Sequence, residues 1–144
     1  MLIMRPDLTE GRMIIQHPNS LLMHQCLQAA SVGDRQTLRA LWAPDIVWRI
    51  KGGDPKVGDI KGADNILDFL ALMGDVGSTG IHTEVEDVMI SNERAAVICH
   101  SYLQIGDRVL DTDFLVIATI ISRRIQEVTT VPFDQKRVAE FWAA

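Results

Sequence analysis

The feature that most constrains this fold is a run of four β-rich segments in the second half of the chain. Only short turns separate them, and Ser91-Asn92 and Gly106-Asp107 are typical turn formers at two of the three junctions. Short turns between consecutive strands predict hairpins, so this half is expected to form an antiparallel sheet. The expected strands are residues 81–91, 95–105, 108–121 and 124–131.

Helical periodicity predicts four helices, three of which come before the long strands. Asn19 or Ser20 is a suitable N-cap for the first helix, Asp34 for the second and Asp134 for the last. Gly33 is a typical stop signal after the first helix. The third helix is expected between residues 63 and 74, and a short strand at 46–50 precedes it.

The order of these elements predicts a single α+β domain, because the helices gather at the front and do not alternate with the strands. We expect a curved antiparallel sheet wrapped around three N-terminal helices, with a short C-terminal helix and a cleft between sheet and helices. The domain is expected to span residues 19–144 of the 144-residue chain. Residues 1–18 are expected to be a leader that lies on the domain or on a partner subunit.

The composition excludes some classes of function. The net charge of −5 argues against non-specific nucleic-acid binding, which needs clustered Lys and Arg. No apolar run approaches the roughly 20 residues of a membrane-spanning helix. Cys26 and Cys99 do not form a Cys-x-x-Cys pair, and buried thiols are the simpler interpretation. We therefore expect a cytoplasmic protein without nucleic-acid or membrane partners.

Several segments, taken in order, resemble the SnoaL-like branch of the nuclear transport factor 2-like superfamily. They are Gly33-Asp34, Ala43-Pro-Asp-Ile-Val-Trp48, Gly58-Asp-Ile-Lys-Gly62, Asp111-Thr-Asp-Phe-Leu115, Ile125-Gln-Glu-Val128, Pro132-Phe-Asp134 and Phe141-Trp142. The resemblance implies a cone-shaped fold with an apolar pocket at its open end, and often a homodimer built sheet to sheet. It implies no single activity, because the superfamily includes isomerases, cyclases, hydrolases, dehydratases and proteins without catalysis.

Asp111 and Asp113 are two residues apart on one expected strand, so both point to the same face of the sheet. If that face lines the pocket, burial and like charge would raise at least one carboxyl pKa and suit the pair to acid/base chemistry. Asp113 also falls near the position where the resemblance places the hydrogen-bonding acid of ketosteroid isomerase. The alternative is that both side chains face solvent.

The sequence departs from that isomerase at the other catalytic positions. The resemblance places its base near Arg49 or Ile50, and neither is a carboxylate. It places the tyrosine near Cys26, whereas the only tyrosine of this chain is Tyr102. The Asp-Arg-Asp set of the epoxide hydrolases is not recognisable either. Neither steroid isomerisation nor epoxide hydrolysis is therefore expected.

Other polar residues also share strand faces. His100 and Tyr102 could serve as a base and a hydrogen-bond donor, or lie in a dimer interface, where tyrosine is common. His82 and Glu84 repeat this spacing one strand earlier. His82, His100 and Asp113 could form a metal set, but their spacing matches no known ligand signature, so no metal is expected.

Three further residues are candidates for the pocket wall. Trp48 is expected to line its mouth or the core, and Glu127 and Thr129 lie on the last strand, one of whose faces could be the cavity. The glycine-rich stretch 52–62 lacks the order of a phosphate loop, so we expect a lid over the pocket.

These features favour a small enzyme that needs no cofactor and performs acid/base chemistry on an apolar carbonyl compound. Asp113 would be the acid or base, and His100 or Tyr102 would polarise the substrate. The alternative is a binding module of the same fold, because the isomerase base is missing. In both cases the expected partners are an apolar small molecule and a second copy of the chain, joined through the sheet.

Overall fold

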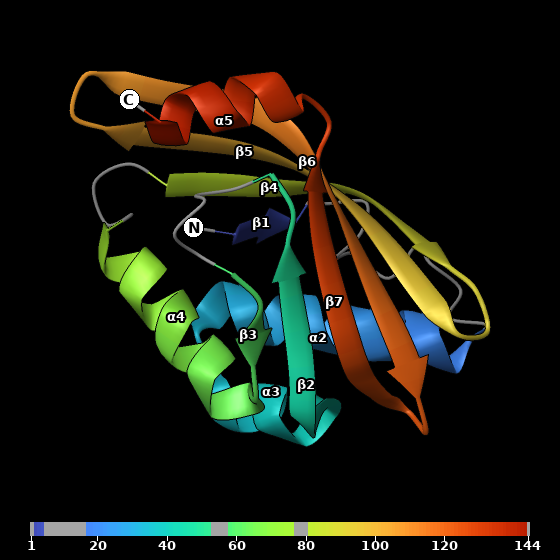
Figure 1. The fold of residues 1–144 in the computed structure, drawn as a ribbon. Helices are drawn as coiled ribbons and strands as arrows, with labels where there is room; N and C mark the ends of the chain where they lie inside the picture. Colours follow the sequence, from blue (N-terminus) through green and yellow to red (C-terminus); the bar gives the residue numbers. More distant parts are fainter. Residues whose placement is uncertain (1, 5–16, 53–57, 77–80, 144) are drawn as a thin grey trace.

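The computed structural model describes residues 2–4, 17–52, 58–76 and 81–143. It confirms an α+β fold with a curved sheet and helices on its inner side (Figure 1). The helices are α2 (Pro18–Val32), α3 (Arg35–Leu41), α4 (Ala63–Val76) and α5 (Gln135–Ala143). The strands are β1 (Leu2–Met4), β2 (Trp42–Ile50), β3 (Ile60–Lys61), β4 (Ile81–Ile90), β5 (Arg94–Ile105), β6 (Arg108–Ile121) and β7 (Arg124–Pro132).

The sheet has seven strands in the order β1-β4-β5-β6-β7-β2-β3. Strands β4 to β7 form the expected antiparallel meander, but β1 pairs parallel with β4, and β2 pairs parallel with β7. The sheet is therefore mixed, not purely antiparallel. The hairpin argument applies only to strands joined by short turns, and neither parallel pair consists of strands adjacent in sequence.

The N-terminal segment and the glycine-rich stretch each contribute a strand that the sequence pattern did not predict. Leu2–Met4 forms edge strand β1, and Ile60–Lys61 pairs with β2 as β3. Residues 5–16, within the expected leader, and 53–57, within the expected lid, lie outside the described part of the chain. Their roles stay predictions.

The ends of α2 and α3 follow the expected local signals with one change. Helix α2 begins at Pro18, and the N-cap is His17, whose ring accepts a hydrogen bond from the backbone N–H of Asn19. The Asn19 side chain instead donates to the carbonyl oxygens of residues 91 and 92, which ties α2 to the turn between β4 and β5. Gly33 ends α2 in the left-handed conformation, with φ of 71°, as expected.

Two apolar clusters cover the inner side of the sheet. The larger joins α2, α3 and α4 to the strands and includes Leu22, Ile66, Val85 and Val97. The smaller joins α5 to Leu103 and Leu110 on β5 and β6. Figure 1 shows α5 at one end of the molecule and α2 and α3 at the other. No helix within the described ranges is long and apolar enough to cross a membrane.

Candidate functional site

Strand alternation divides the long strands into two faces of different chemistry. The helix-facing side is identified by buried residues that pack on the helices, such as Val85, Val97 and Cys99. Because side chains alternate, the neighbours of these residues point to the opposite side, which we call the outward face. The cross-strand register then assigns each candidate residue to one face.

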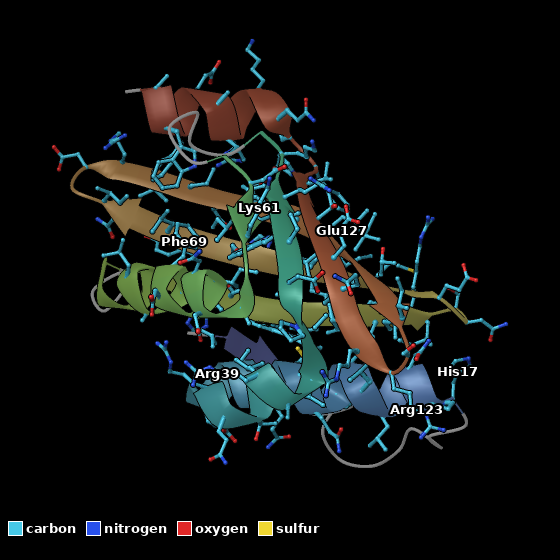
Figure 2. All side chains as sticks on the ribbon, turned by 60° about the horizontal axis from the view of Figure 1, so that its bottom comes forward. His17, Arg39, Lys61, Phe69, Arg123 and Glu127 are labelled. Atoms are coloured by element: carbon cyan, nitrogen blue, oxygen red, sulfur yellow. The ribbon has the colours of Figure 1, made fainter. Side chains whose placement is uncertain are left out.

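Aromatic side chains lie on the helix-facing side, where Trp48 was expected. The Trp48 indole Nε1 donates a hydrogen bond of 2.9 Å to Thr130 Oγ1. The ring of Phe69 on α4 meets the Trp48 ring edge to face, with centroids 5.5 Å apart. Figure 2 shows Phe69 on the side of α4 that faces the strands. Both rings remain partly exposed, so they form an aromatic wall that the core does not fully cover.

A row of hydroxyl groups crosses β4, β5 and β6 on the same side. Ser101 lies opposite Thr83 on β4 and Thr112 on β6, and the Thr83 and Ser101 hydroxyl oxygens are 3.0 Å apart. Thr112 is buried, whereas Thr83 and Ser101 are partly exposed. The row lies between the two apolar clusters, with Cys99 on one side and Leu103 on the other. The row was not predicted, because Ser101 is the one hydroxyl residue in the otherwise apolar phase of β5.

The ionisable groups on the helix-facing side are poor acid/base catalysts at neutral pH. Among the described residues of β2 and β4–β7, this side carries no carboxylate and no imidazole. Burial raises the pKa of the Cys99 and Cys26 thiols to about 11. Cys26 stands where the resemblance placed a tyrosine, and its sulfur accepts a hydrogen bond from the Trp42 indole.

The outward face carries the acidic and imidazole groups. His100 is half-buried; its Nδ1 lies 2.6 Å from an Asp113 carboxylate oxygen, and its Nε2 is hydrogen-bonded to Asp111. The hydrogen bond to Asp113 raises the pKa of His100, with Asp111 adding to the effect and burial opposing it. A doubly protonated ring donates on both sides, so the two carboxylates stabilise the imidazolium form.

The prediction that these residues line the space between sheet and helices is therefore corrected. Asp111 and Asp113 do share a face, and they lie opposite Tyr102 and His100, but that face points away from the helices. His82 and Glu84 lie opposite Tyr102 and His100 on β4 and share the outward orientation. Apolar residues occur on both faces of β5; Ile98, for example, lies on the outward face. Alternation alone therefore did not reveal which face was buried.

One further outward residue, Glu86, was not among the predicted site residues. Glu86 is two residues after Glu84, so alternation places it outward, and a β-bulge between Val85 and Asp87 shifts the register of β4 next to it. One ligand-capable atom each from Glu86, His100 and Asp113 lies within 4.8 Å of the others. No local pattern in the sequence signals this bulge.

Glu127 and Thr129 also lie on the outward face. The Arg49 guanidinium bridges Glu127 at 2.6 Å and Asp59 at 2.7 Å, and these acids raise the pKa of Arg49. Thr129 pairs with Arg49 in the parallel ladder between β7 and β2. Figure 2 shows Glu127 beside β7. Trp48 is thus the only proposed wall residue that faces the helices within the described ranges.

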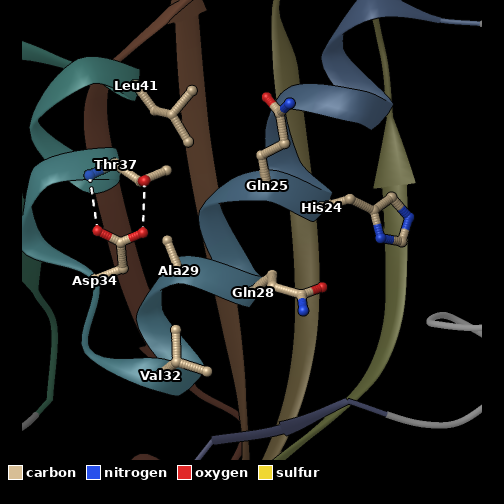
Figure 3. A pocket seen from close by; sticks show the side chains of 8 residues that line it. All are labelled: His24, Gln25, Gln28, Ala29, Val32, Asp34, Thr37 and Leu41. Carbon is tan, nitrogen blue, oxygen red and sulfur yellow. Dashed lines mark hydrogen bonds between the residues drawn. The ribbon is translucent and has the colours of Figure 1, made fainter.

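A separate open groove of about 490 Å³ lies between α2 and α3 (Figure 3). Asp34 and Thr37 lie at its edge and hydrogen-bond each other, which fixes the start of α3. His24 extends away from α3 in this view. Burial lowers the pKa of His24, and its Nε2 is buried without a hydrogen-bond partner among the described residues. Every residue that lines this groove belongs to α2, α3 or the turn between them, and none belongs to the sheet.

Comparisons with known proteins agree with this architecture. The chain is 26% identical over 126 residues to the uncharacterised protein Rv0034 of Mycobacterium tuberculosis, covering 85% of this chain and 94% of the relative. The structure of Bal32a, from a soil-derived mobile gene cassette, superposes with a TM-score of 0.77 at 21% identity, covering 87% and 96% of the two chains. The structure of IdmH, a putative polyketide cyclase from Streptomyces antibioticus, superposes with a TM-score of 0.66 at 20% identity, covering 86% of this chain and 98% of IdmH. The family model of the SnoaL-like domain matches residues 23–128, and the chain belongs to this family.

Proposed function

We propose that this protein binds an apolar small molecule carrying a carbonyl or hydroxyl group on the helix-facing side of its sheet. The observation that carries the proposal is the hydroxyl row of Thr83, Ser101 and Thr112. Hydroxyl groups placed between two apolar clusters suit a ligand that is mostly apolar and has one polar end. The aromatic wall of Trp48 and Phe69 adds a surface for a planar ring.

Binding is favoured over acid/base catalysis by the location of the ionisable groups. Asp113, His100 and Tyr102, the expected catalytic set, face outward. A hydroxyl can orient a carbonyl and polarise it, but it is a weak base at neutral pH. The proposed site therefore holds its ligand by shape and hydrogen bonds.

The binding proposal can be tested with acetonaphthone, an aromatic ketone, and with ethylnaphthalene, which has a similar shape but no carbonyl. Calorimetric titration should show tighter binding of the ketone. Thr112→Val should remove that preference, because one hydrogen bond contributes about 0.5–1.5 kcal/mol, or roughly twofold to tenfold in affinity. Thr129→Val is the matched control on the outward face and should change neither affinity. Equal loss in both variants would contradict the proposed location.

Cyclase-type catalysis at the same site is the second candidate, and the similarity to the putative polyketide cyclase IdmH favours it. In that case the hydroxyl row would polarise a substrate carbonyl. Incubation of the protein with polyketide-like poly-ketones, followed by mass spectrometry, would detect a dehydrated or rearranged product. The Asp113→Asn variant tests whether catalysis takes place on the helix-facing side or on the outward face. Turnover should be unchanged in this variant, whereas a hundredfold loss would restore Asp113 as the catalytic acid or base.

We also propose a homodimer through the outward face. Ile98, Leu115 and Val131 form a continuous apolar row across β5, β6 and β7, and each is partly exposed. Tyr102, 37% exposed, lies on the same face, beyond His100. Such a surface suits a two-fold contact between identical faces. Light scattering should give twice the 16.1 kDa chain mass, and Leu115→Arg should return the protein to that mass. A wild-type monomer would contradict the dimer.

A further inference from the structure

The outward cluster around His100 has the donor set of a cation site. One ring nitrogen of His100, an Asp113 oxygen and a Glu86 oxygen lie within 4.8 Å of one another and come from three adjacent strands. Glu84 lies directly opposite His100 and Asp111 contacts its Nε2. The carboxylates of Glu86, Asp111 and Asp113 thus lie around one imidazole, and their negative charge favours a bound cation.

We propose that Glu86, His100 and Asp113 bind a divalent metal ion of the zinc class. One imidazole nitrogen and two carboxylate oxygens form a three-ligand set that leaves a fourth position open for water or another ligand. The mixed nitrogen and oxygen donors, without a thiolate, suit zinc better than the all-oxygen sites of magnesium or calcium.

The required movement of the ligands is small. Tetrahedral ligands at about 2.0–2.1 Å from zinc stand roughly 3.3 Å apart. His100 Nδ1 and Asp113 Oδ1 are 2.6 Å apart, so these two atoms need to separate by less than an ångström. A Glu86 oxygen lies within 4.8 Å of a ligand atom of His100 and one of Asp113, and the side chains of His100 and Asp113 are half-exposed and able to adjust.

Asp111 gives the cluster a second feature typical of metal sites. A metal-bound histidine usually donates its other ring N–H to a carboxylate, which fixes the orientation of the ring. Asp111 contacts His100 Nε2 in this manner, while Nδ1 faces Asp113. Asp111 would therefore act as a positioning residue and not as a ligand.

The site does not depend on the proposed ligand pocket, because it lies on the opposite face of the sheet. A metal there would join β4, β5 and β6 close to the proposed dimer row. The open fourth position faces outward, where it is available to water or to a group from another molecule.

Zinc chloride titrated into the chelator-treated full-length protein tests the proposal. Calorimetry should show saturation at one zinc ion per chain. Cobalt chloride should give the strong visible absorption of a tetrahedral site, a signal that loose surface binding does not produce. His100→Gln and Glu86→Gln should each abolish the stoichiometric binding and the cobalt signal, and Asp111→Asn should weaken binding about tenfold to a hundredfold.

His82→Gln is the matched control, because His82 lies on the same face of β4 but outside the three-ligand set. It should leave zinc affinity unchanged. Circular dichroism should confirm that every variant is folded, as expected for exchanges on an accessible face. Absence of stoichiometric zinc binding to the wild type, or equal loss in His82→Gln and His100→Gln, would overturn the site. Neither result would affect the ketone-binding test of the proposed pocket.

Discussion

The two faces of the long strands are built from the same segments but have opposite chemistry. The helix-facing side combines buried aliphatic residues with aromatic rings and the row of Thr83, Ser101 and Thr112. The outward face carries His100, Asp111 and an apolar row beside them. The difference teaches that ionisable residues clustered in a strand do not mark the interior. In this chain they mark the face that water or a partner can reach.

The largest effect should come from placing a charge on each face in turn at adjacent residues of β5. Val97 is 1% exposed on the helix-facing side, whereas Ile98 is partly exposed on the outward face. Val97→Asp should destabilise the fold by about 4 kcal/mol or more, because it buries an unpaired carboxylate. Ile98→Asp should leave the monomer folded and weaken only the proposed dimer. Urea unfolding monitored by circular dichroism measures both, and similar losses would break the two-face description.

The next effect concerns thiol reactivity. Because burial raises the pKa of Cys99 to about 11 from an ordinary 9.0, the reactive thiolate forms only as the pH approaches 11. At pH 8 the native thiolate population should be about a hundredfold smaller than that of an exposed cysteine, and labelling should accelerate as the pH rises. Mass spectrometry after iodoacetamide treatment checks this, with urea-unfolded protein as the control. Rapid native labelling would show that Cys99 does not face the core.

A smaller effect is expected at the aromatic wall. Trp48→Phe keeps an aromatic ring at this position but removes the indole N–H and its 2.9 Å hydrogen bond to Thr130 Oγ1. The expected cost in unfolding free energy is about 0.5–1.5 kcal/mol, with some loss of affinity for a planar ligand. Chemical denaturation and ligand titration of the same sample measure both quantities. A stability unchanged by the substitution would mean that the hydrogen bond contributes nothing to the fold.

The smallest effect should appear at the adjacent residue on the opposite face. Arg49→Met removes the ion pairs with Glu127 and Asp59, whose charged groups are more than one-third exposed. Exposed ion pairs contribute little to stability and are screened by salt. The stability difference from wild type should shrink in high salt, which denaturation at two salt concentrations would measure. A large, salt-independent loss would indicate a buried role for Arg49.

The sequence predicted the parts of the fold that depend on local signals. The turns at Ser91-Asn92 and Gly106-Asp107 correctly placed β4, β5 and β6, and Gly33 and Asp34 correctly placed the boundary between α2 and α3. The parallel pairing of β2 with β7 was missed, because it joins segments far apart in the chain.

The candidate site was predicted less well, for reasons specific to these strands. Asp111 and Asp113 were correctly placed on one face, because alternation needs only their spacing. Which face is buried depends on packing, and the apolar residues in both phases of β5 concealed it. Glu86 lies on the outward face by the same alternation as Glu84 and was overlooked, whereas the hydroxyl row is assembled across three strands and depends on register.

The central claim is that the helix-facing side takes the ligand, and threonine-methyl NMR tests it most directly. Thr83, Thr112 and Thr130 lie on that side, whereas Thr119 and Thr129 lie outward. Acetonaphthone added to methyl-labelled protein should shift the first three signals and leave the outward two in place. Shifts confined to Thr119 and Thr129 would contradict the account and place the ligand on the face of His100.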